Sequence, residues 1–287
     1  MALDFTEYFK RYEAIVAEVN ALFAKFEAEM PDKVKCGKGC SDCCNALFDI
    51  TLVEAIYLNK QFNEKFSGIE RSEILTRADK ADRLIHKLKR KVYKASREGV
   101  PATEVLREVA KARVRCPLLG DDDLCALYEN RPITCRLYGV PTSIGGEAHT
   151  CNLSGFKGGE KYPTVNMDIV LDRLIALGKD LQKGIGSRFS DLGNMLLPVS
   201  MALVSDYSEE YLGVKGAEPA KPKKAAQTGT TFTGSKAAQP KAEKAEAPVA
   251  KKAEAAKKKG EACASCTAGE SACSTCDLKT ITLGGGK

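Results

Sequence analysis

The stretch CGKGCSDCC at residues 36–44 constrains the fold of this chain more than any other feature, because four of its nine residues are cysteine. A second cysteine segment begins only at Cys116, after residues 45–115. The adjacent pair Cys43-Cys44 is awkward both as a disulfide and as two ligands of one small metal ion. The fold therefore has to bring two distant segments together and give the two adjacent thiols different partners.

The spacing of the cysteines predicts a metal-ligand set. The first segment reads C-x3-C-x2-C-C and the second reads C-P-x7-C-x9-C-x15-C. In a helix or turn, residues three and four apart lie on one side, so Cys36, Cys40 and one of the adjacent pair face the same site. The other thiol of the pair then points elsewhere, which favours two neighbouring centres, or one centre and a spare thiol. The candidate ligands are Cys36, Cys40, Cys43, Cys44, Cys116, Cys125, Cys135 and Cys151.

The redox state of the cellular compartment decides whether the cysteines bind metal or form disulfides. The N-terminal sequence MALDFTEYFKRYEAIVAEV lacks the pattern of a secretory signal, so we expect a cytoplasmic protein with twelve reduced thiols. Four thiolates suit zinc or an iron–sulfur cluster. The irregular spacing, the Cys116-Pro117 step and the number of thiolates favour an iron–sulfur cluster, of the 4Fe–4S type, with zinc as the alternative.

Three other residues near the cysteines are candidates for supporting roles. Arg131 and Arg136 could stabilise a thiolate-rich centre through their guanidinium donors. The alternative is an ordinary salt bridge for each. His149, two residues before Cys151, could replace a thiolate as a ligand.

The apolar periodicity predicts a mainly α-helical fold with irregular cysteine-rich metal-binding segments. Phe5, Phe9, Tyr12, Val16, Val19, Phe23 and Phe26 line one face of the first predicted helix. We expect residues 115–151 to be irregular, with a helical turn or two at 124–130 and a short hairpin at Gly145-Gly146. The predicted helices cover residues 4–30, 49–62, 69–97, 102–114, 164–183 and 188–212, the last with a break near Pro198.

Composition divides the chain into three parts. We predict a helical cysteine-cluster domain over 1–215, a flexible linker rich in Lys, Ala and Pro over 216–260, and a small C-terminal motif over 261–287. The last part carries C-x2-C-x6-C-x2-C, which indicates a second metal site or a pair of redox-active dithiols. Its cysteines are Cys263, Cys266, Cys273 and Cys276. This tail is also the candidate contact for a protein or redox partner.

Charge and motifs exclude several function classes. The net charge of +6 comes from the lysine-rich linker, and residues 1–215 are neutral, which argues against nucleic-acid binding by the main domain. No apolar run is long enough to span a membrane. The chain lacks a P-loop, a dinucleotide-binding glycine motif, a G-x-S-x-G elbow and H-E-x-x-H. No catalytic residue is indicated.

The combination of CGKGCSDCC with RCPLL and LCALYENRPITCRLYG resembles the YkgJ-type cysteine-cluster family, a zinc- or iron-chelating CxxCxxCC domain, over roughly residues 30–155. The resemblance rests on Cys43-Cys44, Cys116-Pro117, Cys125 near Tyr128, and Arg131-Pro132 leading to Cys135-Arg136. The first spacing is C-x3-C where the family has C-x2-C. The resemblance implies metal or iron–sulfur binding. Members are often labelled iron–sulfur oxidoreductases, and flagellin lysine N-methylases are similar in the cysteine region.

We therefore expect a metal-binding protein, with an iron–sulfur cluster and a redox or electron-transfer role as the first hypothesis. The first alternative is a zinc-binding structural, metal-chaperone or interaction protein. The second is a protein-modifying enzyme similar to flagellin lysine N-methylase.

Overall fold

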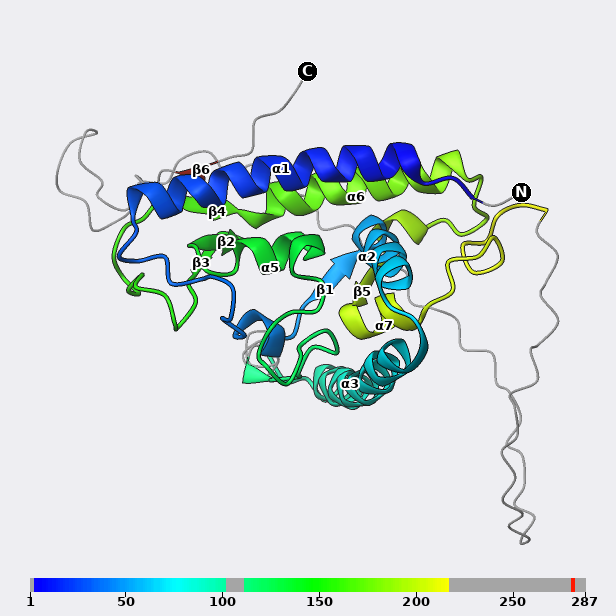
Figure 1. Cartoon of the computed structure of the whole chain (residues 1–287), viewed down its shortest axis with the longest axis horizontal. Helices are drawn as coiled ribbons and strands as arrows, with labels where there is room; N and C mark the ends of the chain where they lie inside the picture. The colour runs from blue at the N-terminus through cyan, green and yellow to red at the C-terminus, as the bar shows by residue number, and fades with distance from the viewer. Residues whose placement is uncertain (1–2, 102–110, 217–279, 282–287) are drawn as a thin grey trace, which may run out of the picture. The chain divides into compact units, whose positions relative to one another are not determined.

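The computed structural model describes residues 3–101, 111–216 and 280–281 (Figure 1). The predicted mainly α-helical fold is confirmed in this part of the chain. The predicted helix at 102–114 and the predicted linker and C-terminal motif lie almost wholly outside the described residues. The α-helices are α1 (Thr6–Glu29), α2 (Leu52–Lys65), α3 (Gly68–Arg97), α5 (Ile133–Leu137), α6 (Met167–Gly184) and α7 (Val199–Val204). Three short 3₁₀ turns are η1 (Cys43–Asn45), η2 (Tyr128–Asn130) and η3 (Leu192–Asn194).

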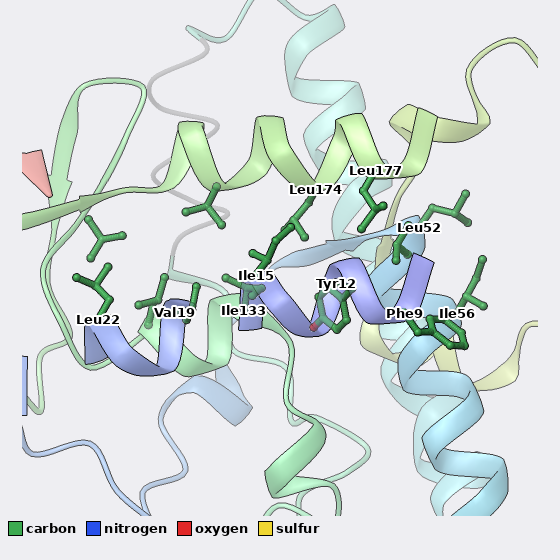
Figure 2. Close-up of a cluster of buried hydrophobic side chains, with 14 of the residues drawn as sticks. Phe9, Tyr12, Ile15, Val19, Leu22, Leu52, Ile56, Ile133, Leu174 and Leu177 are labelled. Atoms are coloured by element: carbon green, nitrogen blue, oxygen red, sulfur yellow. The ribbon is translucent and has the colours of Figure 1, made fainter. Parts of the chain in front are cut away.

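Helix α1 supplies one wall of the larger hydrophobic core (Figure 2). Its buried face differs slightly from the predicted stripe, because Ile15 and Leu22 are buried where Val16 and Phe23 were expected, and those two pack only partly against the core. Residues four and three apart lie on nearly one face of a helix, so both stripes satisfy the period and only the neighbours decide between them. Those neighbours are α6, with Leu174 and Leu177, α2, with Leu52 and Ile56, and α5, with Ile133.

A buried carboxylate joins α2 to α5. Glu54 accepts hydrogen bonds from the backbone N–H and the hydroxyl of Thr51, both at 2.9 Å, which caps the start of α2. Its other oxygen accepts a hydrogen bond, at 3.0 Å, from the N–H of Ile133, which is the first residue of α5. Burial raises the pKa of Glu54 above its usual range. This carboxylate therefore fixes the short helix that carries Cys135.

Two small sheets complete the fold. β1 (Asp49–Thr51) pairs antiparallel with β5 (Leu196–Pro198). The second sheet has the order β3-β2-β4-β6. In it β2 (Thr142–Ile144) and β3 (Glu147–His149) form the predicted hairpin around Gly145-Gly146, while β4 (Thr164–Asn166) and β6 (Thr280–Ile281) pair in parallel. Both hairpin glycines have positive φ, 59° and 82°, which L side chains rarely adopt.

The predicted helix over 188–212 is wrong for most of its length, since only α7 is α-helical there, although the predicted break at Pro198 is present. Gly193 lies directly against Gly178 of α6, where a Cβ on Gly178 would stand 2.7 Å from the Gly193 carbonyl oxygen. Pro198 cannot continue a helix and ends β5 instead. This segment therefore pairs with β1 and packs against α6 instead of forming one continuous helix.

A second core packs α2, α3 and α7 together. From α3 it buries Ile74 and Ala78. Arg77 of the same helix donates from Nε to the carbonyl of Pro117 at 3.0 Å, and Lys65 of α2 donates to the carbonyl of Ala126 at 2.7 Å. These bonds tie the second cysteine segment to the two helices. Within the described residues, no helix is both long and apolar enough to cross a membrane.

Candidate metal centre

The two cysteine segments meet through backbone hydrogen bonds. The N–H of Cys116 donates to the carbonyl of Cys44 at 2.6 Å, and the N–H of Val114 donates to the carbonyl of Asn45 at 3.1 Å. An isolated β-bridge between Ala46 and Arg113 extends this pairing. The two cysteine segments, which residues 45–115 separate in the sequence, therefore lie side by side in the fold, as their shared ligand set requires.

One group of cysteines surrounds a small cavity, which we call the inner cavity. Its volume is about 50 Å³. The 3₁₀ turn η1 presents Cys44, α5 presents Cys135, and the irregular chain before η2 presents Cys116 and Cys125. We call these four the inner set. Leu119, which is buried, packs among Cys43, Cys44 and Cys135 and closes the group.

A second group lines an adjacent cavity of about 10 Å³, the outer cavity. The cysteines on its wall are Cys36, Cys40, Cys43 and Cys151, which we call the outer set. Cys43 also lines the inner cavity, so it forms part of the wall between the two. The structure thus gives Cys43 and Cys44 different surroundings, with Cys43 reaching both cavities and Cys44 only the inner one.

Two close contacts position the outer set. Gly139 follows α5 and lies against Cys36, so closely that a Cβ at this position would stand 2.1 Å from the Cys36 Cβ. Cys151 donates from Sγ to Asp42 at 3.3 Å and accepts the N–H of Leu153 at 3.4 Å. Both the Gly139–Cys36 contact and the Cys151–Asp42 hydrogen bond therefore join the first cysteine segment to the second.

Hydrogen bonds link the thiols across the wall between the cavities. Hydrogen bonds from Cys135 and Cys44 hold the pKa of Cys43 well below its ordinary value. The bond from Cys44 also lowers the pKa of Cys125, while donating these bonds raises the pKa values of Cys44 and Cys135. These hydrogen bonds favour the thiolate forms of Cys43 and Cys125 over those of Cys44 and Cys135.

Burial acts against further ionisation. It raises the pKa of Cys36 to about 11 and that of Cys116 to about 12, and it also raises the pKa of Cys151. A buried anion without a counter-ion is costly, so the protein alone cannot charge all eight thiols. A bound cation removes this restriction, because metal binding displaces the thiol protons.

Arg131 is a positive charge that acts on cysteines of both sets. Its guanidinium stacks 3.6 Å above the ring of Tyr128, and its Nε donates to the Tyr128 carbonyl at 2.8 Å. Its charge favours the thiolate forms of Cys36, Cys43 and Cys125. Arg131 lines the inner cavity and also a larger space beside Cys36.

Arg136 bonds to backbone carbonyls and to α1. Its donors go to the carbonyls of Arg131, at 2.8 Å, and Glu129, and to Asn20 of α1 at 3.0 Å. Burial lowers its pKa. Arg136 therefore holds the backbone that carries Arg131 and does not line the inner or the outer cavity.

Sequence reasoning missed a polar group at the rim of the outer set. Asp42, between Cys40 and Cys43, accepts from Arg113 at 2.7 Å as well as from Cys151. The side chain of Arg113 also hydrogen-bonds to Tyr138. This bond and the negative charge of Asp42 raise the pKa of Arg113. An acidic residue inside a cysteine run is the only sequence signal for this network. Glu54, which holds α5, gave no such signal beyond its capping spacing.

His149 lies on the exposed strand β3 and lines neither cysteine cavity. It lines a cleft of about 360 Å³ beside Cys151, with Arg113 and Tyr138 on its wall. The cleft has room for a small molecule next to the outer set. The cysteines Cys263, Cys266, Cys273 and Cys276 lie outside the described residues.

The donor set fits a thiophilic metal or an iron–sulfur cluster by its chemistry. Each set consists of four cysteines, soft ligands that suit zinc, copper(I) and iron–sulfur clusters. Among the described residues no three Cys, His, Asp or Glu side chains already stand at ligand spacing. The thiols instead bond to one another, and deprotonation has to accompany their closure on a metal.

The comparisons with known proteins agree with this donor set. Residues 35–152 match the CxxCxxCC family, described as a putative zinc- or iron-chelating domain, which confirms the resemblance that the motifs indicated. The narrower name YkgJ is not part of this match. The matched residues contain all eight cysteines of the two sets. No curated protein and no solved structure matches the chain.

Proposed function

We propose, from the premise that residues 35–152 form a zinc- or iron-chelating CxxCxxCC domain, that the chain binds two neighbouring metal centres through its inner and outer sets. The observation that carries the proposal is the distribution of eight cysteines over two adjacent cavities. Three line only the outer cavity, four line only the inner one, and Cys43 lines both. Four thiolates complete the usual ligand set of either a zinc ion or an iron–sulfur cluster.

An iron–sulfur cluster in the inner set is the favoured occupant. Buried clusters of thiolate ligands carry a net negative charge, which the surroundings have to stabilise. Arg131 supplies a positive charge beside the inner cavity, and the apolar residues Leu58, Leu118 and Leu127 exclude water from it. An iron–sulfur cluster held by Cys44, Cys116, Cys125 and Cys135 would supply one-electron redox chemistry. The protein therefore works as a redox or electron-transfer protein.

The outer set is the more exposed of the two sets, and either a zinc ion or a cluster is a candidate to occupy it. Three of its cysteines are only half-buried, and the cleft beside Cys151 opens next to it. A zinc ion here would be a structural staple, which is the first alternative for the whole protein. The C-terminal C-x2-C motif is a further candidate site and a candidate contact for a redox partner.

Purification of the full chain under anaerobic conditions, with iron and zinc both supplied, tests the proposal. We expect iron and inorganic sulfide in the protein and a broad absorption band near 400 nm (roughly the range of such clusters) that bleaches on reduction. A colourless protein with stoichiometric zinc would replace the redox function by the structural one. A protein without metal would contradict both.

A further inference from the structure

A buried hydroxyl without a partner faces the inner cavity. Ser200, the second residue of α7, is 1% exposed, and its Oγ has no hydrogen-bond partner among the described residues. Leaving a buried hydroxyl unbonded is unfavourable, because the group loses its bonds to water and gains none in return. Native structures contain few such groups, and each calls for a physical explanation.

The walls of the inner cavity restrict what Ser200 can bond. The side chains around it are apolar, as at Leu58, Ile85 and Val199, except for Arg131, Arg115 and the cysteines. The two arginines can only donate hydrogen bonds. Among the described side chains that line the cavity, the cysteine sulfurs are therefore the only acceptors for the Ser200 hydroxyl.

We infer that Ser200 belongs to the inner site and donates its O–H to an anionic sulfur atom when that site holds metal. The sulfur is either a cysteine thiolate or an inorganic sulfide, and both accept hydrogen bonds better than a neutral thiol does. The inference rests on the proposed function, since it needs a metal in the inner set. Ser200 would then be a positioning residue that stabilises the occupied site.

The inference predicts opposite effects of one substitution in two states of the same protein. In the full chain stripped by a chelator, Ser200→Ala removes an unbonded hydroxyl, so the melting temperature stays equal or rises. In the metal-loaded chain the substitution removes a hydrogen bond to the site, so the melting temperature falls. In competition with a chelator, the variant should bind its metal with an affinity about tenfold weaker than that of the wild type. Losses of this size are typical when a residue that hydrogen-bonds a metal ligand is replaced.

Tyr207 provides a matched control. Its hydroxyl is the other buried side-chain oxygen without a partner in the described part of the chain, and it does not line the inner cavity. Tyr207→Phe should therefore shift the melting temperatures of the stripped and loaded proteins by the same amount. Loading with zinc alone, in parallel with iron plus sulfide, separates the two sulfur sources. An effect of Ser200→Ala with both identifies a thiolate, and an effect only with iron plus sulfide identifies the inorganic sulfide.

Two results would overturn the inference. An equal destabilisation of stripped and loaded protein by Ser200→Ala would mean that a resident water or a neighbouring group already bonds the hydroxyl. An unchanged metal affinity would mean that the hydroxyl does not reach the site. Both results require that the wild-type protein binds metal under the same conditions. A wild-type protein that takes up no metal would instead refute the proposed function.

Discussion

The contact between Gly139 and Cys36 leads to the sharpest prediction about the outer set. Substitution Gly139→Ala places a Cβ 2.1 Å from the Cβ of Cys36 and 3.0 Å from its Sγ. Carbon atoms in contact stay about 3.5 Å apart, so Cys36 or the turn after α5 has to move by roughly 1.4 Å. The backbone angles of Gly139 are accessible to alanine, since this glycine has no positive φ. The effect is therefore one of space alone.

The size of the effect follows from this displacement. Overpacking of a well-packed interior costs about 1–3 kcal/mol of unfolding free energy. Metal–ligand distances hold to about 0.2 Å, so a shift of this size removes Cys36 from a ligand set. We expect Gly139→Ala to lower the unfolding free energy of the stripped protein by 1–3 kcal/mol (about the overpacking range) and to weaken metal binding by the outer set at least tenfold.

Gly37→Ala is the matched control. Gly37 is the neighbour of Cys36 and has no positive φ. Apart from Gly37 itself and its two chain neighbours, no residue has an atom within 4 Å of the Cβ that alanine would add. Replacing it should change the unfolding free energy by less than about 1 kcal/mol, in the stabilising direction, because the unfolded chain loses freedom. Denaturant unfolding and metal analysis of both variants check the prediction. Equal stability and metal content in the two would refute the proximity of Gly139 to a metal ligand.

Three further predictions follow from the described contacts. Cys44→Ser should remove the metal of the inner set and leave that of the outer set, and an unchanged metal content would make Cys44 a spare thiol. Arg131→Gln should weaken metal loading about tenfold, with Arg131→Lys recovering part of it, because the positive charge favours the thiolates of both sets. Glu54, whose pKa burial raises above 4.5, stabilises the fold fully below pH 4.5 and loses this contribution as pH rises through its folded-state pKa. The stability of the wild type relative to Glu54→Gln should therefore fall from pH 4.5 upwards in denaturant unfolding, and a difference independent of pH would contradict the burial of this carboxyl group.

The long helices could be predicted from the sequence because their period is repeated many times. α1, α3 and α6 begin and end within a few residues of the predicted bounds. Of the three-residue strands, only the β2–β3 hairpin was predicted, from Gly145-Gly146 at its turn. The others could not be predicted, since alternation needs a longer run to be visible. α5 was missed for the same reason. Its five residues show no period, and it depends on Glu54 of α2 to accept the N–H of Ile133.

The candidate site was predictable in its ligands and not in its surroundings. The spacing of the cysteines identified all eight residues around the two cavities, and it indicated that Cys43 and Cys44 have different partners. Gly139, Asp42 and Ser200 act through contacts between segments far apart in the chain, and a sequence without a structure carries no distance between them. Whether each cysteine ligates a metal remains a prediction.

The metal content of single-set variants tests the central claim most directly. The starting protein is the full chain with the four C-terminal cysteines replaced by serine, so that only the two sets can bind. Cys36→Ser should remove the metal of the outer set, Cys116→Ser that of the inner set, and the double variant both, as measured by metal analysis per chain after anaerobic purification. If either single substitution removed all the metal, the two sets would be one centre, and if neither changed it, these cysteines would not be ligands.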